Sequence, residues 1–277
     1  MLSDTGSVDM GATREYFKDQ FSVNKLTLDH GNASEFYVGW WQTGQSAVHL
    51  LCLRLILFLG CIGIFTTSLV MTSGAFSLNY WAIYMTHWGV LMIMVTSGLA
   101  FMVSLVACIN GDIDADFGLP WYVRVYWASL VITVPVAYFI TIFYYSFLTA
   151  LAEEFAVNPV LDFFIHAMNS IVMFLLLMTS RHPVHLLQFV YPFGFAVVYM
   201  AFSIIYYYAG GTNPQGEVWI YPVLDWSNPG LTTGVVFGCA ALVIIVHCLV
   251  VLMALFRDYL TSTCLSSKRN SLDIAEY

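Results

Sequence analysis

Six long apolar stretches divide this sequence into seven polar segments, and they constrain the fold more than any other feature. About 20 apolar residues are enough to cross the ~30 Å hydrocarbon core of a bilayer as a helix. Apolar runs of this length in lipid must satisfy their backbone hydrogen bonds internally, which a helix does. The sequence therefore predicts an all-α integral membrane protein, a bundle of six transmembrane helices. The predicted spans are 47–71, 80–108, 122–148, 159–179, 186–209 and 232–256.

The basic residues all fall on one side of this predicted topology. They lie in alternate polar segments or at the span ends next to them, whereas the other three polar segments contain no Lys or Arg. Cytosolic segments carry an excess of Lys and Arg, so both termini are predicted to be cytosolic. The chain then divides into a cytosolic N-terminal segment (1–46), a transmembrane domain (47–256) and a cytosolic tail (257–277). The basic residues are Arg14, Lys18, Lys25, Arg54, Arg124, Arg181, Arg257, Lys268 and Arg269.

Composition excludes several classes of protein. Charged residues make up 9% of the chain, against about a quarter in soluble domains, so the protein belongs in lipid. The net charge is -8 and no basic patch exists to bind nucleic acid, which leaves membrane lipid as the expected partner. The length of the spans favours the plasma membrane over the thinner endoplasmic reticulum membrane. We expect Arg54, two turns into the first span, to extend back to the cytosolic interface.

Ionisable residues within the fourth span are candidates for function, because such residues are costly in lipid. Asp162 and His166 are four residues apart, so they share one helix face, and Asn169 with Ser170 continue it. A polar stripe of this kind is expected to face the interior of the bundle.

Topology gives His166 a partner in the second span. Both spans begin on the non-cytosolic side, and Thr86 and His166 lie at similar depths below that interface. A Thr hydroxyl near an imidazole, with Asp162 behind the ring, is the arrangement of an activated nucleophile. The structural alternative is that Thr86 bonds its own backbone and His166 holds helices together. Thr66, Thr67, His87, Thr141 and Tyr144 fall near the same depth and extend a polar layer.

A metal site is the competing chemical interpretation. His87, His166 and Asp162, with Glu154, have side chains that can bind zinc. The sequence has no HExxH or paired-cysteine motif to support such a site, so we predict neither a metal nor another cofactor.

Three segments resemble the rolling stone family. They are YMTHWG (84–89), HAMNS (166–170) and, most specifically, YYYAGGTNPQGEVWIYPVLDW (206–226). The resemblance extends over residues 37–257. The family takes its name from an insect membrane protein associated with myoblast fusion. His87 stands where rolling stone relatives tend to have Asn.

The family is similar in turn to the androgen-induced membrane proteins, which hydrolyse fatty acid esters of hydroxy fatty acids with a Thr and a His. The resemblance places these residues on Thr86 and His166. It thus implies a lipid-ester hydrolase. The acidic non-cytosolic loops, which contain Glu153, Glu154, Glu217 and Asp225, predict that a hydrophobic ester enters sideways from the lipid.

Two other functions are open at this point. A non-enzymatic protein of cell-cell contact or myoblast fusion would present the Trp- and Pro-containing loop 210–230 to a protein partner. We expect that loop to be ordered against the bundle. A transporter is less consistent with the sequence, because no second half of the chain repeats the first.

Overall fold

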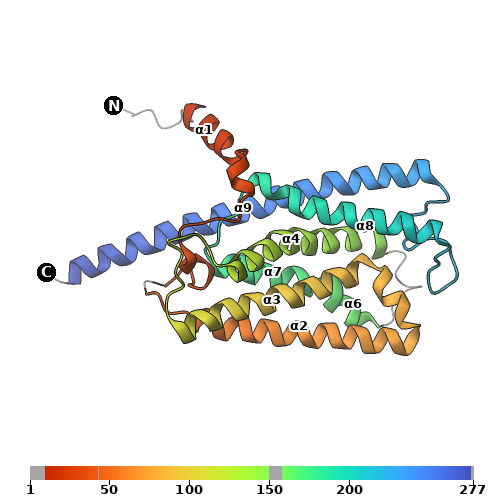
Figure 1. Cartoon of the computed structure of the whole chain (residues 1–277), viewed down its shortest axis with the longest axis horizontal. Helices are drawn as coiled ribbons and strands as arrows, with labels where there is room; N and C mark the ends of the chain where they lie inside the picture. Colours follow the sequence, from red (N-terminus) through yellow and green to blue (C-terminus); the bar gives the residue numbers. More distant parts are fainter. Residues whose placement is uncertain (1–9, 43, 150–157, 276–277) are drawn as a thin grey trace.

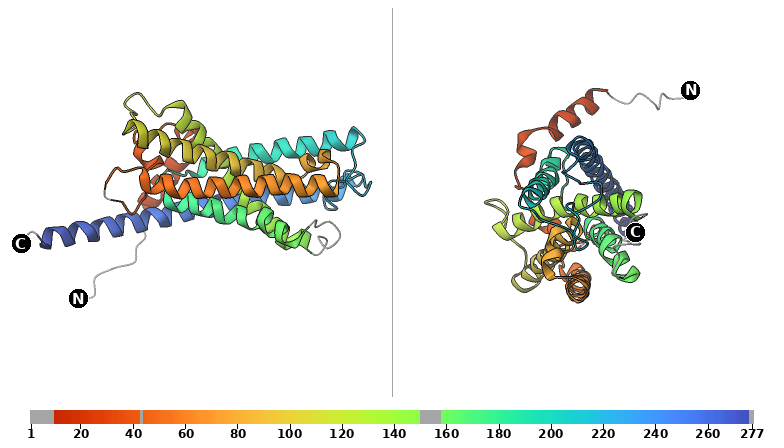
Figure 2. Two further views of the ribbon diagram at one scale, coloured as in Figure 1. Left: turned by 90° about the horizontal axis from the view of Figure 1, so that it is seen from below. Right: turned by 90° about the vertical axis from the view of Figure 1, so that its right-hand side faces the viewer.

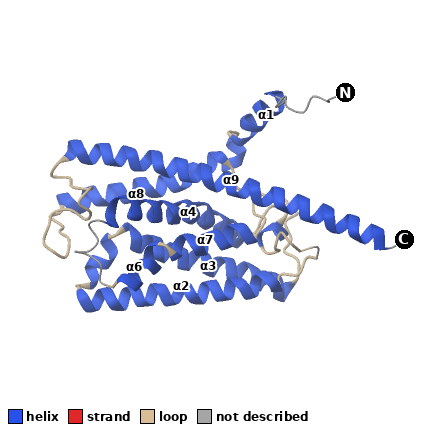
Figure 3. Cartoon of the chain, turned by 180° about the vertical axis from the view of Figure 1, so that it is seen from behind, coloured by secondary structure: helices blue, strands red, loops and turns tan. Residues whose placement is uncertain are grey.

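The computed structural model describes residues 10–42, 44–149 and 158–275, and this part of the chain is helical without strands (Figures 1 and 3). Within it, six helical segments are long and apolar enough to cross a membrane, which confirms the predicted fold class. The segments lie close to the predicted spans. They are Val48–Ala75, Met85–Asn110, Trp121–Leu148, Pro159–Thr179, Leu186–Tyr208 and Pro229–Thr263.

Several spans contain more than one helical element. The spans comprise α2 (Val48–Ala75), α3 (Met85–Asn110), α4 (Trp121–Phe143) with the π-helix η4 (Tyr144–Leu148), α6 (Pro159–His166) with α7 (Met168–Thr179), η5 (Leu186–Phe189) with α8 (Val190–Tyr208), and α9 (Pro229–Ala275). Before them come α1 (Met10–Gln20) and the 3-10 turns η1 (Val23–Leu26) and η2 (Ala33–Phe36). A further 3-10 segment, η3 (Leu78–Ile83), connects α2 to α3.

Helix α4 is the centre of the bundle. It contacts α3, α7, α8 and α9, and it is the most buried of the six spans (Figure 2). Its residues Tyr126, Trp127 and Leu130 belong to the largest core cluster, together with Ala100 of α3 and Met173 of α7. Helix α2 packs against α3 on one side of α4, and α8 packs against α9 on the other. This layout leaves α8 and α9 with broad outward faces.

The two ends of the bundle differ in charge. Both termini leave from the end that holds Arg54, Arg181 and Arg257, here called the basic end (Figures 1 and 2). An even number of spans returns the chain to the side of the bundle where it began, so both termini lie at the same end. The opposite end carries the loop between α8 and α9.

Arg54 lies inside the bundle, so the expectation that it extends to the interface is wrong. Its side chain is fully buried, and its guanidinium donates to the Ala100 carbonyl (3.1 Å), Ser104 Oγ (2.7 Å) and Tyr126 Oη (3.2 Å). The guanidinium carbon also lies 5.3 Å from the centre of the Tyr126 ring. These acceptors and the ring replace water around the charge, which makes burial tolerable.

Helix α9 is longer than the predicted sixth span. It runs for 47 residues and extends past the bundle at the basic end (Figure 1). The sequence contains no Gly or Pro between residues 239 and 275 to end it. The apolar pattern marks only the part of α9 that lies inside lipid. Hydropathy alone therefore placed the end of the sixth span at residue 256.

Candidate functional site

Thr86 lies in the first turn of α3, and the preceding segment explains why the helix begins there. The 3-10 segment η3 ends at Ile83, and Tyr84 has extended backbone angles (φ -88°, ψ 128°) before α3 starts at Met85. The first backbone N–H groups of a helix have no carbonyl partner within it. The buried Thr86 hydroxyl therefore sits at a helix N-terminus whose first N–H, that of Met85, donates to Tyr199 Oη at 3.2 Å.

His166 ends α6, which begins with a well-defined cap. The Asn158 side chain accepts from the N–H groups of Val160 and Leu161, and Pro159 occupies the first helical position. One turn later Asp162 and His166 project from the same face, as the spacing predicted. The helix is interrupted at Ala167 before α7 begins.

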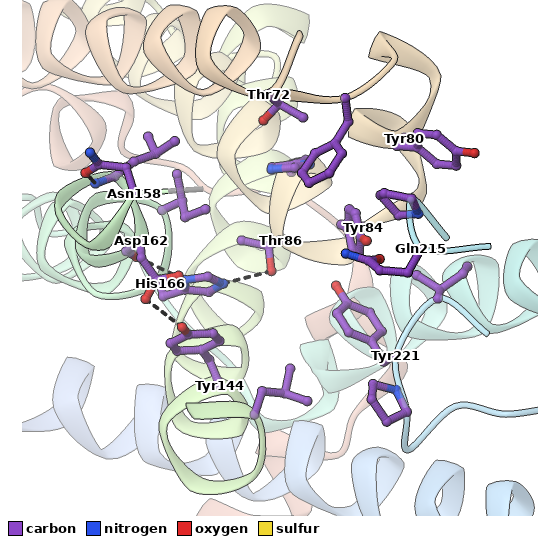
Figure 4. A pocket seen from close by; sticks show the side chains of 18 of the residues that line it. Thr72, Tyr80, Tyr84, Thr86, Tyr144, Asn158, Asp162, His166, Gln215 and Tyr221 are labelled. Carbon is purple, nitrogen blue, oxygen red and sulfur yellow. Dashed lines mark hydrogen bonds and ion pairs between the residues drawn. The ribbon is translucent and has the colours of Figure 1, made fainter. Parts of the chain in front are cut away.

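The structure brings Thr86, His166 and Asp162 together in one chain of contacts (Figure 4). Thr86 Oγ1 lies 3.3 Å from His166 Nε2, and His166 Nδ1 lies 3.1 Å from Asp162 Oδ1. Thr86 and His166 are 8% and 7% exposed, so water competes little for this contact. The separation of 3.3 Å is slightly long for a hydrogen bond, as is common before substrate binds.

The partners of the His166 ring determine its tautomer. Nδ1 faces two acceptors, the Asp162 carboxylate and the Asp162 backbone carbonyl at 3.0 Å, so it carries the proton and donates. In the neutral ring Nε2 then has no proton and accepts from the Thr86 hydroxyl. This is the protonation state that a general base requires.

Tyr144 fixes both the carboxylate and the ring. Its hydroxyl donates to Asp162 Oδ2 at 2.6 Å, and its ring stacks on the His166 ring at 3.5 Å between centroids with an 8° tilt. Tyr144 opens the π-helix η4, a local widening of the third span that is frequent at functional sites. The second Asp162 oxygen is thereby occupied, leaving Oδ1 for His166.

Thr141 stabilises the interruption in the fourth span. Its hydroxyl donates to the His166 backbone carbonyl and lies 2.7 Å from Ser170 Oγ. A side chain inserted at a carbonyl freed by a helix break is an ordinary cause of such a break. Thr141 thus connects α4 to the residue that carries the imidazole.

Replacing Thr141 by valine is expected to lower the free energy of unfolding by about 1–3 kcal/mol, because the buried His166 carbonyl loses its donor. Thermal unfolding of the detergent-solubilised protein measures this change. Thr66→Val is the matched control, since the Thr66 hydroxyl is exposed and bonds carbonyls of its own helix. An equal effect of both substitutions would contradict a role for Thr141 at the break.

The loop between α8 and α9 closes over the site, which confirms that it is ordered. The Asn213 side chain accepts from the N–H groups of Gln215 and Glu217, and Trp226 Nε1 donates to Ser203 Oγ. Tyr221 of this loop reaches Thr86 (Figure 4). Burial raises the pKa of Tyr221, and hydrogen bonds with Thr86, Met85 and Tyr199 oppose the rise.

A cavity of about 150 Å³ lies next to these residues, here called the polar cavity. It borders the three contacting residues Thr86, His166 and Asp162, with Tyr84, Gln215 and Tyr221 on the loop side (Figure 4). The arrangement can therefore accept a small group directly beside the Thr86 hydroxyl.

Other residues of the predicted polar layer have different roles. His87 borders the polar cavity, but its Nδ1 donates to the Trp81 carbonyl at 2.6 Å and its ring stacks on Trp81. Thr66 and Thr67 are exposed on the outward face of α2. Asn169 donates to the Ile165 carbonyl, behind the site. The predicted polar layer therefore exists between α4 and α6. Thr66 and Thr67 of α2 do not belong to it, because both are on the outward face of that helix.

The residues named as alternative metal ligands do not assemble in the described part of the chain. No three His, Cys, Asp or Glu side chains there come close enough together to hold a metal ion. Glu154, one of the candidate ligands, lies outside the described residues, as does Glu153.

Sequence reasoning missed Tyr221 and assigned no contact to Tyr144. Tyr221 is in a loop, where no helical period predicts which way a side chain points. Its only signal was its place within the 206–226 segment that carries the family resemblance.

Comparison with known proteins gives consistent results over most of the chain. The family model described as "Protein rolling stone" matches residues 14–263. Protein rolling stone from Drosophila melanogaster is 26% identical over 219 residues, which cover 76% of this chain and 75% of that protein. No solved structure matches the chain.

Proposed function

The chain belongs to the rolling stone family of multi-pass membrane proteins, and we propose that it hydrolyses lipid esters dissolved in the bilayer. The observation that carries the proposal is the contact chain from Thr86 Oγ1 through His166 to Asp162 Oδ1. Each member has the hydrogen-bond partner that nucleophilic ester cleavage needs.

In the first half of the reaction, Thr86 Oγ1 attacks the ester carbonyl carbon and His166 Nε2 takes the hydroxyl proton. The resulting imidazolium lies between Asp162 Oδ1 and the Thr86 oxygen, and the carboxylate stabilises its charge. The bond from the carbonyl carbon to the alcohol oxygen then breaks. The departing alkoxide takes the proton from Nε2 and leaves as an alcohol. The acyl group remains bonded to Thr86 Oγ1 as an ester.

Water completes the second half. It attacks the acyl carbon while His166 Nε2 accepts its proton, and the bond from that carbon to Thr86 Oγ1 breaks. Thr86 regains its proton from Nε2 and a fatty acid is released. The net reaction consumes one ester and one water and yields one alcohol and one acid, so it needs no cofactor.

The Tyr221 hydroxyl supplies a donor for the negative oxygen that forms on the carbonyl carbon. This hydroxyl lies at the first turn of α3, where it hydrogen-bonds with the backbone of Met85 and Thr86, and the Met85 N–H also donates to Tyr199 Oη at 3.2 Å. Donors held at this position in a dry site stabilise an oxyanion. Burial raises the pKa of Tyr221, so its hydroxyl stays protonated and able to donate at neutral pH.

Tyr221→Phe is therefore expected to lower kcat by about 10²-fold with little change in KM, because the lost donor acts only in the transition state. Steady-state ester hydrolysis by purified protein measures this. Tyr208→Phe is the control, since Tyr208 is 81% exposed and lines neither cavity. A rise in KM alone would assign Tyr221 to substrate binding instead.

We place the site in the non-cytosolic half of the bilayer, from the distribution of basic residues, and we favour the plasma membrane. The loop over the site carries Glu217 and Asp225, which repel anions arriving from that aqueous side. Entry between helices from the lipid is the route that this charge favours.

The direct test uses purified protein in liposomes that contain a fatty ester. The fatty acid released over time is the quantity measured. Turnover that depends on Thr86 supports the proposal. Protein that is folded but releases no acid from any fatty ester would contradict it.

A contact function is favoured by one observation, the ordered and exposed tip of the loop. Residues 215–218 are exposed, and Val218 is 46% exposed, while Asn213 holds the tip in one conformation. A partner-binding protein would lose binding when this tip is replaced and keep it in Thr86→Ala. The opposite result would favour the hydrolase.

A further inference from the structure

A second cavity, here called the apolar cavity, lies between α4, α8 and α9. Its volume is about 380 Å³, within the range of small-molecule sites. None of the described side chains that line it is charged. The lining includes Phe143, Val197, Met200, Val236, Ala240 and Val243.

The two cavities meet at the candidate nucleophile. Thr86, Tyr144, Leu148 and Tyr221 line both of them. An ester carbonyl held beside Thr86 Oγ1 would therefore extend one substituent into each cavity. The cavities differ in size and polarity, so they select different substituents.

The apolar cavity reaches the lipid-facing surface of the bundle. Val197 of α8 and Phe237 of α9 line it and are 42% and 71% exposed on the outside. Both residues lie within membrane-spanning segments, so that outside is acyl chain. A long hydrocarbon chain can thus enter between α8 and α9 without crossing water.

The polar cavity suits a small and uncharged group. A cavity of about 150 Å³ holds a group about the size of benzene. Asp162 is a carboxylate in its wall, and no described Lys or Arg lines either cavity. A phosphate or second carboxylate placed there would face this charge without a cation. Tyr84, Asn158 and Gln215 instead offer partners for hydroxyl groups.

From this pairing we propose that the substrate is an ester of one long fatty acid with a small uncharged alcohol, such as glycerol. The acyl chain lies in the apolar cavity and the alcohol in the polar cavity. The inference rests on the proposed hydrolysis, and it specifies the substrate. Water cleaves the ester at Thr86, the fatty acid returns to the lipid, and the alcohol leaves past the loop.

The acyl side is tested by filling the apolar cavity. Ala240→Phe is expected to lower the ratio of kcat/KM for glycerol monooleate to that for glycerol monobutyrate by at least about tenfold. Ala241→Phe is the control, because Ala241 is the next residue, is exposed and does not line the cavity. Ala196→Phe fills the same cavity from α8 and replaces the first variant if that variant does not fold.

The alcohol side is tested with head groups of different charge on one acyl chain. Glycerol monooleate is expected to react at least about tenfold faster, in kcat/KM, than oleoyl lysophosphatidic acid or lysophosphatidylcholine. Equal rates for the phosphate-containing esters would overturn the assignment of a neutral alcohol to the polar cavity.

Failure of this inference is distinguishable from failure of the hydrolase proposal. A ratio of oleate to butyrate hydrolysis that is the same in wild type, Ala240→Phe and Ala196→Phe would overturn the acyl site while Thr86-dependent turnover remained. Absence of Thr86-dependent turnover on all esters would remove both. A monooleate analogue with a photoreactive chain end, bound to Thr86→Ala, should crosslink to α8 or α9. Crosslinking only elsewhere would also overturn the acyl site.

Discussion

Replacing Thr86 by alanine is expected to lower kcat for ester hydrolysis by at least about 10⁴-fold, because the attacking oxygen is lost. Thr86→Ser keeps the hydroxyl beside His166 Nε2 and should retain measurable turnover. Fatty acid release from glycerol monooleate in liposomes, with equal amounts of each purified protein, measures both variants.

Folding must be separated from chemistry in this comparison. Thr86→Ala removes the hydroxyl contacts with His166 and Tyr221, which cost about 1 kcal/mol each, so the variant should remain folded. Thr66→Ala changes a hydroxyl that bonds carbonyls of its own helix on the outward face of α2, and it should keep full activity. Equal activity of folded Thr86→Ala and wild type would show that Thr86 is not the nucleophile.

Asp162→Asn should have the second largest effect, a fall in kcat of about 10³-fold. Tyr144 donates to Oδ2, so an amide at this position keeps its oxygen there and turns its NH₂ toward His166 Nδ1. That contact favours the tautomer with the proton on Nε2. In this tautomer Nε2 cannot accept the proton of the Thr86 hydroxyl. The Asp162 backbone carbonyl still accepts from Nδ1, so the loss should be smaller than for Thr86→Ala.

The measurement is steady-state hydrolysis of the same ester by Asp162→Asn and by a control, Asp225→Asn. Asp225 lies in the loop, accepts from the Ser227 N–H and lines neither cavity. Turnover by Asp162→Asn within a few-fold of wild type would mean that the carboxylate only holds the helices in place.

Much of the bundle follows from hydropathy alone. Lipid forces long apolar runs into helices, so the positions of the spans, apart from the end of the sixth, could be read from the sequence to within a few residues. Matched depth also made contact between Thr86 and His166 possible, because the second and fourth spans both begin at the same side of the membrane. It did not show that the two helices are neighbours. Side-chain spacing of four residues then placed Asp162 on the face of His166.

Local breaks and buried partners were not predictable in this way. The break at Tyr84 and the break at Ala167 depend on contacts from other elements, such as Thr141 Oγ1 at the His166 carbonyl. Arg54 was expected at the interface because its acceptors, Ser104 and Tyr126, are 50 and 72 residues away in sequence. Tyr221 reaches the site from a loop, where no regular helical spacing predicts the direction of a side chain.

Mass spectrometry of the protein after treatment with an alkyl fluorophosphonate tests the central claim most directly. In the predicted reaction Thr86 Oγ1 displaces fluoride from phosphorus, with His166 Nε2 taking the proton, and the label remains on the peptide that contains Thr86. Wild type should carry one label at Thr86, and His166→Ala should carry much less. Protein that hydrolyses ester while Thr86 stays unlabelled, or that is labelled on another residue with loss of activity, would contradict the account.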